Sequence, residues 1–461
     1  MDQLRIFLDD LRPNDPIPYA ALAYLVGECN YGGRVTDDKD RRCIMNILDD
    51  YYNPSIVSDT YKFSPSGVYF APPPGTLENY REYVRSLPFN EGPEVFGLHD
   101  NANISCAISE TNALLDTVLS LQPKESGGGG KSWAETLDEL AKDIGAKIPG
   151  EYDIEKALIL FPVKYDESMN TVLTQELMRF NRLTNAITST LKEVQKAIKG
   201  LVVMSAELEQ MGNSMVIGKV PVLWSAVAYP SLKNLGAWVI DYLDRIKFLG
   251  DWMDTGESPT VYWISGFFFT QAFITGNQLL LSYIDLFVNI LILIFIFIFK
   301  TKGTLQNFAR RHKIPIDKAD FDFRVLTASE MRFADVKKPD DGAFIKGFFM
   351  EGARWDADNH VVAESLPREL YIKMPYIHLE PKDKASVPVV EGIPEQYTGS
   401  TFGTAHVYMC PVYKTSFRQG VLSTTGHSTN FVMFIRLPIA SEHKQKHWIK
   451  RGVAMLTQLD T

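Results

Sequence analysis

At 461 residues, the chain is long enough for about two or three domains with a sizeable core. Its 45% hydrophobic and 22% charged residues are ordinary for a globular protein, and its formal net charge of −9 gives no reason to expect a nucleic-acid partner. The first residues lack the apolar core of a signal peptide. Four scattered cysteines without a CxxC pair favour free thiols over a disulfide framework or a zinc site.

Residues 1–57 are predicted to form helices around a turn. One apolar-periodic segment follows two early prolines, and a second begins at Cys43. Between these segments, Gly32-Gly33 permits a tight turn, and Thr36 or Asp37 can cap the helix that follows.

The next part of the chain is also predicted to be mainly helical. A short helix is expected over Leu77–Ser86, within the proline- and aromatic-rich residues 58–110. Ser168–Met211 has apolar residues recurring at spacings of three and four, which predicts a core-facing helix or helix pair. Ser231–Trp252 adds another amphipathic helix.

Past Asp317 the pattern changes to short runs of aromatic and β-branched residues separated by turn-forming segments. Four runs are predicted strands: Phe321–Leu326, Phe344–Met350, His406–Tyr413 and Asn430–Leu437. They predict an antiparallel sheet or small barrel, so the fold class is α+β.

The most unusual stretch is the apolar run Leu279–Phe299, in which Asp285 is the one formal charge. Its length equals that of a membrane-spanning helix, so a single-pass membrane protein is one hypothesis. Its flanks favour another. If residues 278–304 are removed, five apolar residues of the flanks fall within roughly a 60° arc of one helix: Trp263, Phe267, Ile274, Leu305 and Phe308. We therefore interpret 278–304 as an apolar insert in a soluble helix, with the composition of translated A/T-rich non-coding sequence.

A set of short motifs runs collinearly along the chain. It includes GECNYGGRVTDDKDRR (residues 27–42), Tyr61–Gly67, Pro93–His99, Gln175–Leu183, Gly218–Pro221, Glu351–Asp356, Cys410–Thr415, Leu422–Val432 and His447–Ala454. These motifs resemble the C-terminal region of dynein heavy chains, and the last two are most similar to inner-arm, single-headed axonemal types. The apolar insert and a longer stretch at Ser386–Ala405 depart from the family pattern.

The resemblance implies a domain organisation. Residues 1–57 would be the C-terminal part of the lid of the last AAA+ module. Residues 58–317 would be the helical part of the dynein C-terminal domain, interrupted by the insert at 278–304. Residues 318–461 would form its β part, a small antiparallel, barrel-like subdomain.

The resemblance also implies a function. The parent heavy chain would be an ATP-driven, minus-end-directed microtubule motor of the cytoplasm and cytoskeleton, in the axoneme of cilia and flagella. This segment would close and brace the AAA+ ring, while ATP and Mg²⁺ would bind in other parts of the parent. Its implied partners are the rest of the ring and, through the full complex, intermediate and light (intermediate) chains and microtubules. The membrane protein with its span at 279–299 remains the alternative.

Ser126–Ser132 is similar to a phosphate-binding loop and opens a third hypothesis, a P-loop NTPase. The loop template needs glycine where Glu125 stands, and a strand should precede it, whereas Ala113–Leu121 has helical periodicity. A surface loop is the better interpretation, and nucleotide binding would distinguish the two.

Other candidate residues also have simpler structural explanations. His443 and His447 have the spacing of two metal ligands on one helix, but no convincing third ligand lies nearby in sequence. Cys410 and His427 could pair as nucleophile and base, but no orienting residue can be named, and the polar cluster at 423–429 fits a hydrogen-bonded loop. The arginines of the first motif could be ring-interface cations without acting as arginine fingers: Arg34, Arg41 and Arg42. We therefore assign no catalytic, cofactor-binding or metal residues.

Deleting residues 278–304 is expected to raise soluble yield and melting temperature and to leave the rest of the fold intact. The reason is that an exposed apolar arm rich in β-branched and aromatic residues promotes aggregation. Soluble yield, thermal melting and membrane partitioning of both forms would be compared. A misfolded deletion variant, together with a full chain that resists carbonate extraction from membranes, would establish the membrane hypothesis instead.

Overall fold

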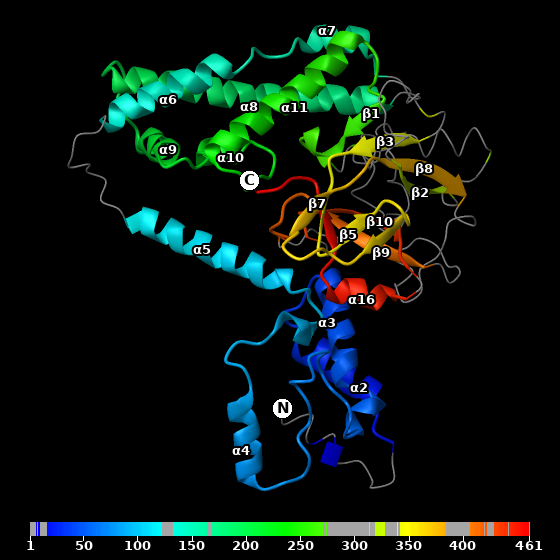
Figure 1. Ribbon diagram of the computed structural model, residues 1–461. Coiled ribbons are helices and arrows are strands. Elements are labelled where there is room, and N and C mark those ends of the chain that lie inside the picture. Colours follow the sequence, from blue (N-terminus) through cyan, green and yellow to red (C-terminus); the bar gives the residue numbers. More distant parts are fainter. Residues whose placement is uncertain are drawn as a thin grey trace, which may run out of the picture.

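The computed structural model describes residues 16–121, 132–163, 168–270, 319–327, 342–383, 406–418, 428–440 and 442–460, with a few isolated residues between them. In Figure 1 the N-terminal helices form one end of the molecule, a layer of helices forms the other end, and the sheets lie beside and between them. The protein therefore has both helices and sheets, in the predicted α+β class. Its four cysteines are free, as their scattered positions indicated.

The N-terminal part contains the predicted helices around a turn. Its elements are α2 (Tyr19–Tyr24), the π-helical turn η1 (Leu25–Asn30) and α3 (Asp38–Tyr51). Asp37, one of the two predicted caps, accepts a hydrogen bond from the backbone N–H of Lys39 at 2.8 Å. Gly32 is needed in the turn, because a Cβ there would lie 1.9 Å from the backbone oxygen of Glu28.

A connecting segment follows, with the elements η2 (Pro54–Val57), α4 (Leu77–Ser86), η3 (Pro93–Phe96) and α5 (Asn101–Leu121). Helix α4 has the predicted bounds and begins with a capping box formed by Thr76 and Asn79. Helix α5 runs from the N-terminal end towards the helical layer (Figure 1).

The helical layer consists of α6 (Trp133–Lys147), α7 (Ile154–Leu160), α8 (Ser168–Ile198), α9 (Ala206–Val216), α10 (Val222–Ser225) and α11 (Leu235–Thr255). The predicted stretch Ser168–Met211 is a helix pair, the second of the two alternatives. Its first helix ends in a Schellman motif: Gly200, at φ +71°, donates to Ala197 O, and Leu201 donates to Lys196 O. This turn leaves Leu201 exposed, although it lies within the predicted stretch at the spacing of its apolar residues.

The β part consists of two sheets and a short ribbon. One sheet has the order β1 (Val261–Trp263), β3 (Ala343–Lys346), β8 (Ile377–Asp383), β2 (Ala319–Val325). The other has the order β10 (Phe431–Pro438), β9 (Val407–Tyr413), β11 (Ala454–Leu456), β4 (Phe349–Glu351), β7 (Tyr371–Lys373). The ribbon is β5 (Arg354–Asp356) and β6 (Val361–Ala363), and helix α16 (Gln445–Lys450) precedes β11.

The predicted antiparallel, barrel-like subdomain is not formed by the strands that the structure describes. These strands make open, mixed sheets, because β1 pairs parallel to β3 and β11 pairs parallel to β9. Strand β11 comes from the end of the chain and enters between β9 and β4. All three of its residues are buried, so it has no alternating pattern from which the sequence could have revealed it.

The predicted helix over 263–277 and 305–311 is wrong at its beginning. Trp263 is the last residue of β1, and Ile264–Gly266 form a single 3₁₀ turn, η4. The parallel pairing of Val261 with Phe344 on β3 overrides the helical spacing, because it buries the strand against the core. Residues 267–269 are also non-helical, and residues 271–272, 274–277 and 305–311, together with the insert 278–304, lie outside the described residues.

No helix among the described residues is long and apolar enough to cross a membrane, and the run 279–299 is not among those residues.

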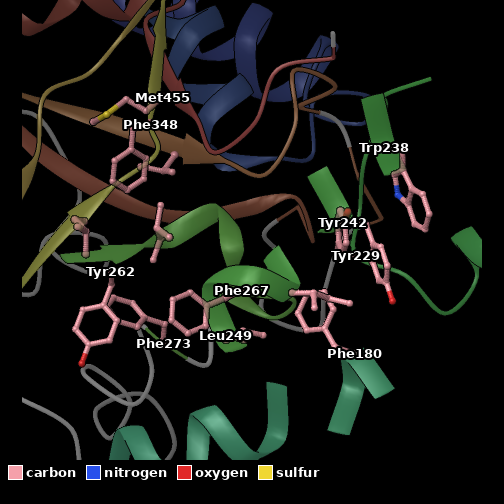
Figure 2. Packing of buried hydrophobic residues seen from close by; sticks show 14 of the residues in the cluster. Phe180, Tyr229, Trp238, Tyr242, Leu249, Tyr262, Phe267, Phe273, Phe348 and Met455 are labelled. Atoms are coloured by element: carbon pink, nitrogen blue, oxygen red, sulfur yellow. The ribbon is translucent and has the colours of Figure 1, made fainter. Parts of the chain in front are cut away.

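One hydrophobic core joins the helical layer to the sheets. Figure 2 shows its two ends: Phe180, Tyr229, Trp238 and Tyr242 lie together on one side, and Phe348 and Met455 lie near the sheet. Between them, Phe267 contacts Phe273 with ring centroids 5.1 Å apart. The aromatic side chains thus make the helical and β parts a single packed body.

A buried charge network crosses this core. Arg245 on α11, which is 2% exposed, donates its Nε–H to Asp241 at 2.7 Å and stacks over the ring of Tyr229 at 3.7 Å. Lys233 also donates to Asp241, at 2.9 Å. Burial alone would raise the pKa of Asp241, but the Arg245 and Lys233 cations outweigh it and hold that pKa below its usual value.

Replacing Asp241→Asn is expected to lower the free energy of unfolding by about 3 kcal/mol, because it leaves the Arg245 guanidinium buried without its anion. The pKa of Asp241 is lower in the folded chain, so its stabilisation exists above the usual aspartate pKa and disappears as pH falls through the folded value. The difference between wild type and variant in chemical denaturation should therefore shrink in acid. Asp244→Asn, on the exposed side of the same helix, is the control. Equal effects of the two substitutions would contradict the prediction.

Candidate functional site

The N-terminal helix α3 lies against α16 and the second sheet (Figure 1). The residues of this contact come from the motif at residues 27–42, from the acidic end of α3 and from the last 55 or so residues of the chain. We call this contact, made by α3 with strands β9 and β10 and helix α16, the joint.

Asp37 connects the start of α3 to the sheet. One carboxylate oxygen caps α3, and the other accepts a hydrogen bond from the backbone N–H of Ser428 at 3.2 Å, just before β10. Its extended backbone, which is typical of an N-cap residue, allows both contacts at once. Asp37 therefore fixes the helix and its orientation on the sheet together.

Two cations of α3 lie on aromatic rings of β10. Lys39 is 7% exposed, and its Nζ lies 4.0 Å from the ring centroid of Phe431. The Arg42 guanidinium lies 5.5 Å from the ring of Phe434 and donates to Met409 O on β9 at 3.4 Å. Desolvation lowers the pKa of Lys39, since burial disfavours its charged form. The joint is thus an aromatic surface that accepts one buried and one half-buried cation.

The other end of the joint is ionic. The side chain of Lys446 on α16 lies 3.2 Å from Asp49 and 3.1 Å from Asp50, measured from Nζ to carboxylate oxygen. Lys450, one turn further along α16, also pairs with Asp50. The same two helices also meet where Cys43 Sγ on α3 lies 3.9 Å from Ile449 O on α16. Several charges form one network here, which contributes more than isolated surface pairs do.

The segment that leads into α5 is fastened to the same surface. Arg451 donates to Gly97 O at 3.2 Å, and Gly97 adopts φ +82°. A Cβ at Gly97 would lie 2.8 Å from Lys450 Cβ, so this close approach requires glycine. The Asn101 amide donates to Leu366 O at 2.9 Å and accepts from the backbone N–H of Arg368 at 2.8 Å.

A cavity of about 450 Å³ lies inside the joint and is lined by Arg34, Asp37, Arg42, Tyr408, Tyr413 and Arg418, among others. The Arg418 guanidinium donates to Glu351 at 2.6 Å and to Gly452 O at 2.7 Å. Burial raises the pKa of the Cys43 thiol, which opposes formation of a nucleophilic thiolate. The cavity walls therefore supply charge and packing to the joint.

The predicted arginines separate into different roles. Arg42 is committed to the joint, Arg34 lines its cavity, and Arg41 pairs with Glu28 at 3.3 Å. The guanidinium groups of Arg41 and Arg42 thus have partners within this chain.

The other candidate residues are only partly described. Cys410 is buried in β9, and burial raises its pKa to about 12, consistent with a structural thiol; His427 lies outside the described residues. Glu125 and Lys131 of the phosphate-loop resemblance also lie outside them. Ser132 caps α6 in a capping box with Glu135.

The histidine pair has a third neighbour that sequence spacing could not reveal. Glu364, just after β6, brings a carboxylate to His443 and His447, with ligand atoms of all three residues within 4.8 Å of one another. The expectation that no third ligand lies near the two histidines was therefore wrong. The sequence could not reveal Glu364, because β6 and α16 are far apart in the chain and meet only in the fold.

The family model for the C-terminal domain of dynein heavy chains matches residues 108–280 and 297–457. The model described as the dynein heavy chain AAA lid domain matches residues 1–102. The first match omits 281–296, which lies inside the predicted insert 278–304. The lid match extends past residue 57, the predicted end of the lid.

Individual relatives agree with these matches. The chain is 47% identical over 460 residues to Dynein axonemal heavy chain 3 of Mus musculus, covering 100% of this chain and 10% of that relative. It is 47% identical over 461 residues to Dynein axonemal heavy chain 1 of Rattus norvegicus, covering 100% of this chain and 9% of that relative. Dynein axonemal heavy chain 12 of Mus musculus is 45% identical, with 99% and 13% covered. The chain, which spans about a tenth of the length of these relatives, belongs to the dynein heavy chain family and corresponds to its AAA lid and C-terminal domain.

Proposed function

We propose that this chain is the ring-closing and bracing segment of an axonemal dynein heavy chain of the inner-arm, single-headed type. The parent would be an ATP-driven, minus-end-directed microtubule motor in cilia and flagella. The observation that carries this proposal is the joint: a lid helix is fixed to the C-terminal domain by a cap, two cations on aromatic rings and an ionic network. Such a contact transmits a displacement of the lid to the C-terminal domain as a rigid unit.

Exposed apolar side chains support a larger assembly around this segment. One face of α5 exposes Ile108, Leu114, Leu115, Val118 and Leu119, each between 45% and 64% exposed. Near the lid helices, Tyr24 and Val57 are 58% and 68% exposed. In the ring these surfaces would be covered by neighbouring modules, because apolar patches of this kind are typical of interaction sites.

The proposal places ATP and Mg²⁺ in other modules of the parent. Ring modules would be the direct partners of this segment. Intermediate and light (intermediate) chains and microtubules would be reached through the full complex in the axoneme. The omission of 281–296 from the family match favours an apolar insert over the single-pass membrane alternative.

Weakening the joint is expected to slow microtubule gliding by the full-length heavy chain without loss of ATP binding. Lys446→Gln with Lys450→Gln removes the ion pairs to Asp49 and Asp50 and keeps the α3 cap intact. The free energy of unfolding should fall by about 1 kcal/mol, and amide exchange in α3 and α16 should accelerate.

The control is Lys142→Gln with Lys147→Gln, which makes the same charge change at exposed pairs within α6, away from the joint. If gliding velocity falls equally in both double variants, or in neither, the joint does not carry the bracing function.

A further inference from the structure

A carboxylate and two imidazoles meet on the side of α16 that faces the β5–β6 ribbon. Glu364 follows β6, His443 lies in the turn before α16, and His447 is on its first turn. Ligand atoms of these residues lie within 4.8 Å of one another, and His447 Nε2 is hydrogen-bonded to Glu364 Oε1. The motor role proposed above does not use this cluster.

The fold fixes the three groups in place. A parallel bridge between Val362 and Ile439 aligns the end of β6 with the segment that leads into α16. His443 N–H donates to Ala440 O at 3.2 Å, which closes the turn before the helix. The buried ring of Trp448 then contacts both imidazoles edge-on, with centroids 5.5 Å and 4.9 Å away. Backbone pairing and a packed aromatic ring thus hold these side chains together.

The chemistry of the cluster matches that of a catalytic-type zinc site. Zn²⁺ takes imidazole nitrogen and carboxylate oxygen at about 2.0–2.2 Å, so tetrahedral ligand atoms lie about 3.4 Å apart. The ligand atoms of the three groups lie within 4.8 Å of one another, so binding an ion would require them to approach by about 1.4 Å at most. His447 and Glu364 are 29% and 35% exposed at their side chains, which allows the ion to enter and leaves a fourth position for water.

The Glu364 carboxylate has an unused acceptor. Its Oε2 is buried and accepts no hydrogen bond, although Arg451 Nε lies 3.3 Å away. Arg451 also repels a cation, which limits the affinity of the site.

We propose that Glu364, His443 and His447 form a divalent transition-metal site of the zinc type, with three protein ligands and a water in the fourth position. A bound ion would cross-link α16 to the β5–β6 ribbon. Since α16 also carries the lysines of the joint, the ion would stiffen the surface on which the lid helix lies.

The test is zinc titration of the EDTA-treated, dialysed 461-residue chain by calorimetry, with Co²⁺ absorption as a spectroscopic readout of ligand number. We expect one Zn²⁺ per chain and a melting temperature that rises with zinc. His443→Gln with His447→Gln, and separately Glu364→Gln, should weaken binding at least about 10-fold and abolish the rise in melting temperature. The control His406→Gln, at an exposed histidine that is not part of the cluster, should bind as the wild type does.

Absence of saturable zinc binding to the wild type, or unchanged affinity in the double variant, would overturn the site. Should a variant fail to fold, diethyl pyrocarbonate labelling of the wild type decides the question. Zinc should protect His443 and His447 from modification and leave His406 reactive, and equal labelling with and without zinc would refute the proposal.

Discussion

The buried guanidinium of Arg245 is the interaction on which the arrangement of the described parts depends. It lies between the helical layer and the end of the chain, paired with Asp241, stacked on Tyr229 and 3.5 Å from Gln458 Oε1. Gln458 in turn is hydrogen-bonded to Pro230 O, so the C-terminal end returns to the helical layer. A buried charge is tolerated only with its full set of partners, and this requirement fixes the relative positions of α11 and the C-terminal end.

That constraint has a consequence for the joint. The C-terminal end follows β11, the central strand that lies between β9 and β4. Strand β9 and its neighbour β10 supply the aromatic and carbonyl groups that receive Lys39 and Arg42. A lid helix fixed to this sheet is therefore connected, through packed strands and one core, to the helical layer at the opposite end of the molecule. This continuity is the physical basis for the proposal that the segment acts as a brace.

The charged residues of α3 connect this helix to the C-terminal domain along its whole length. Asp37 satisfies a helix end and a strand end together, and Lys39 and Arg42 lie on aromatic rings that remain attractive to a desolvated cation. The same helix carries Asp49 and Asp50 near its C-terminal end, where its dipole disfavours negative charge. The lysines of α16 compensate for this unfavourable placement, which links the stability of α3 to the presence of the C-terminal domain.

The sequence by itself determined the local elements whose signal is strong and short-range. A cap at Thr36 or Asp37, α4 over Leu77–Ser86 and the buried stripe of α8 follow from capping chemistry and helical periodicity, and the structure selects Asp37 as the cap. The dynein motifs identified the family, which the family models and relatives confirm. The acidic end of α3 and the basic residues near the end of the sequence were a usable signal for the joint, although nothing in their spacing paired them.

Only the tertiary structure decided the rest, because the deciding contacts join residues that are distant in sequence. Trp263 has helical spacing with its neighbours, yet parallel pairing with β3 makes it the end of a strand. The three-residue strand β11 has no alternating pattern of its own, and it forms because it pairs with β4 on one side and β9 on the other. Glu364 meets His443 and His447 because a single bridge aligns β6 with the segment before α16. Periodicity records the surroundings of one segment, whereas pairing and charge compensation depend on which segments the whole fold brings together.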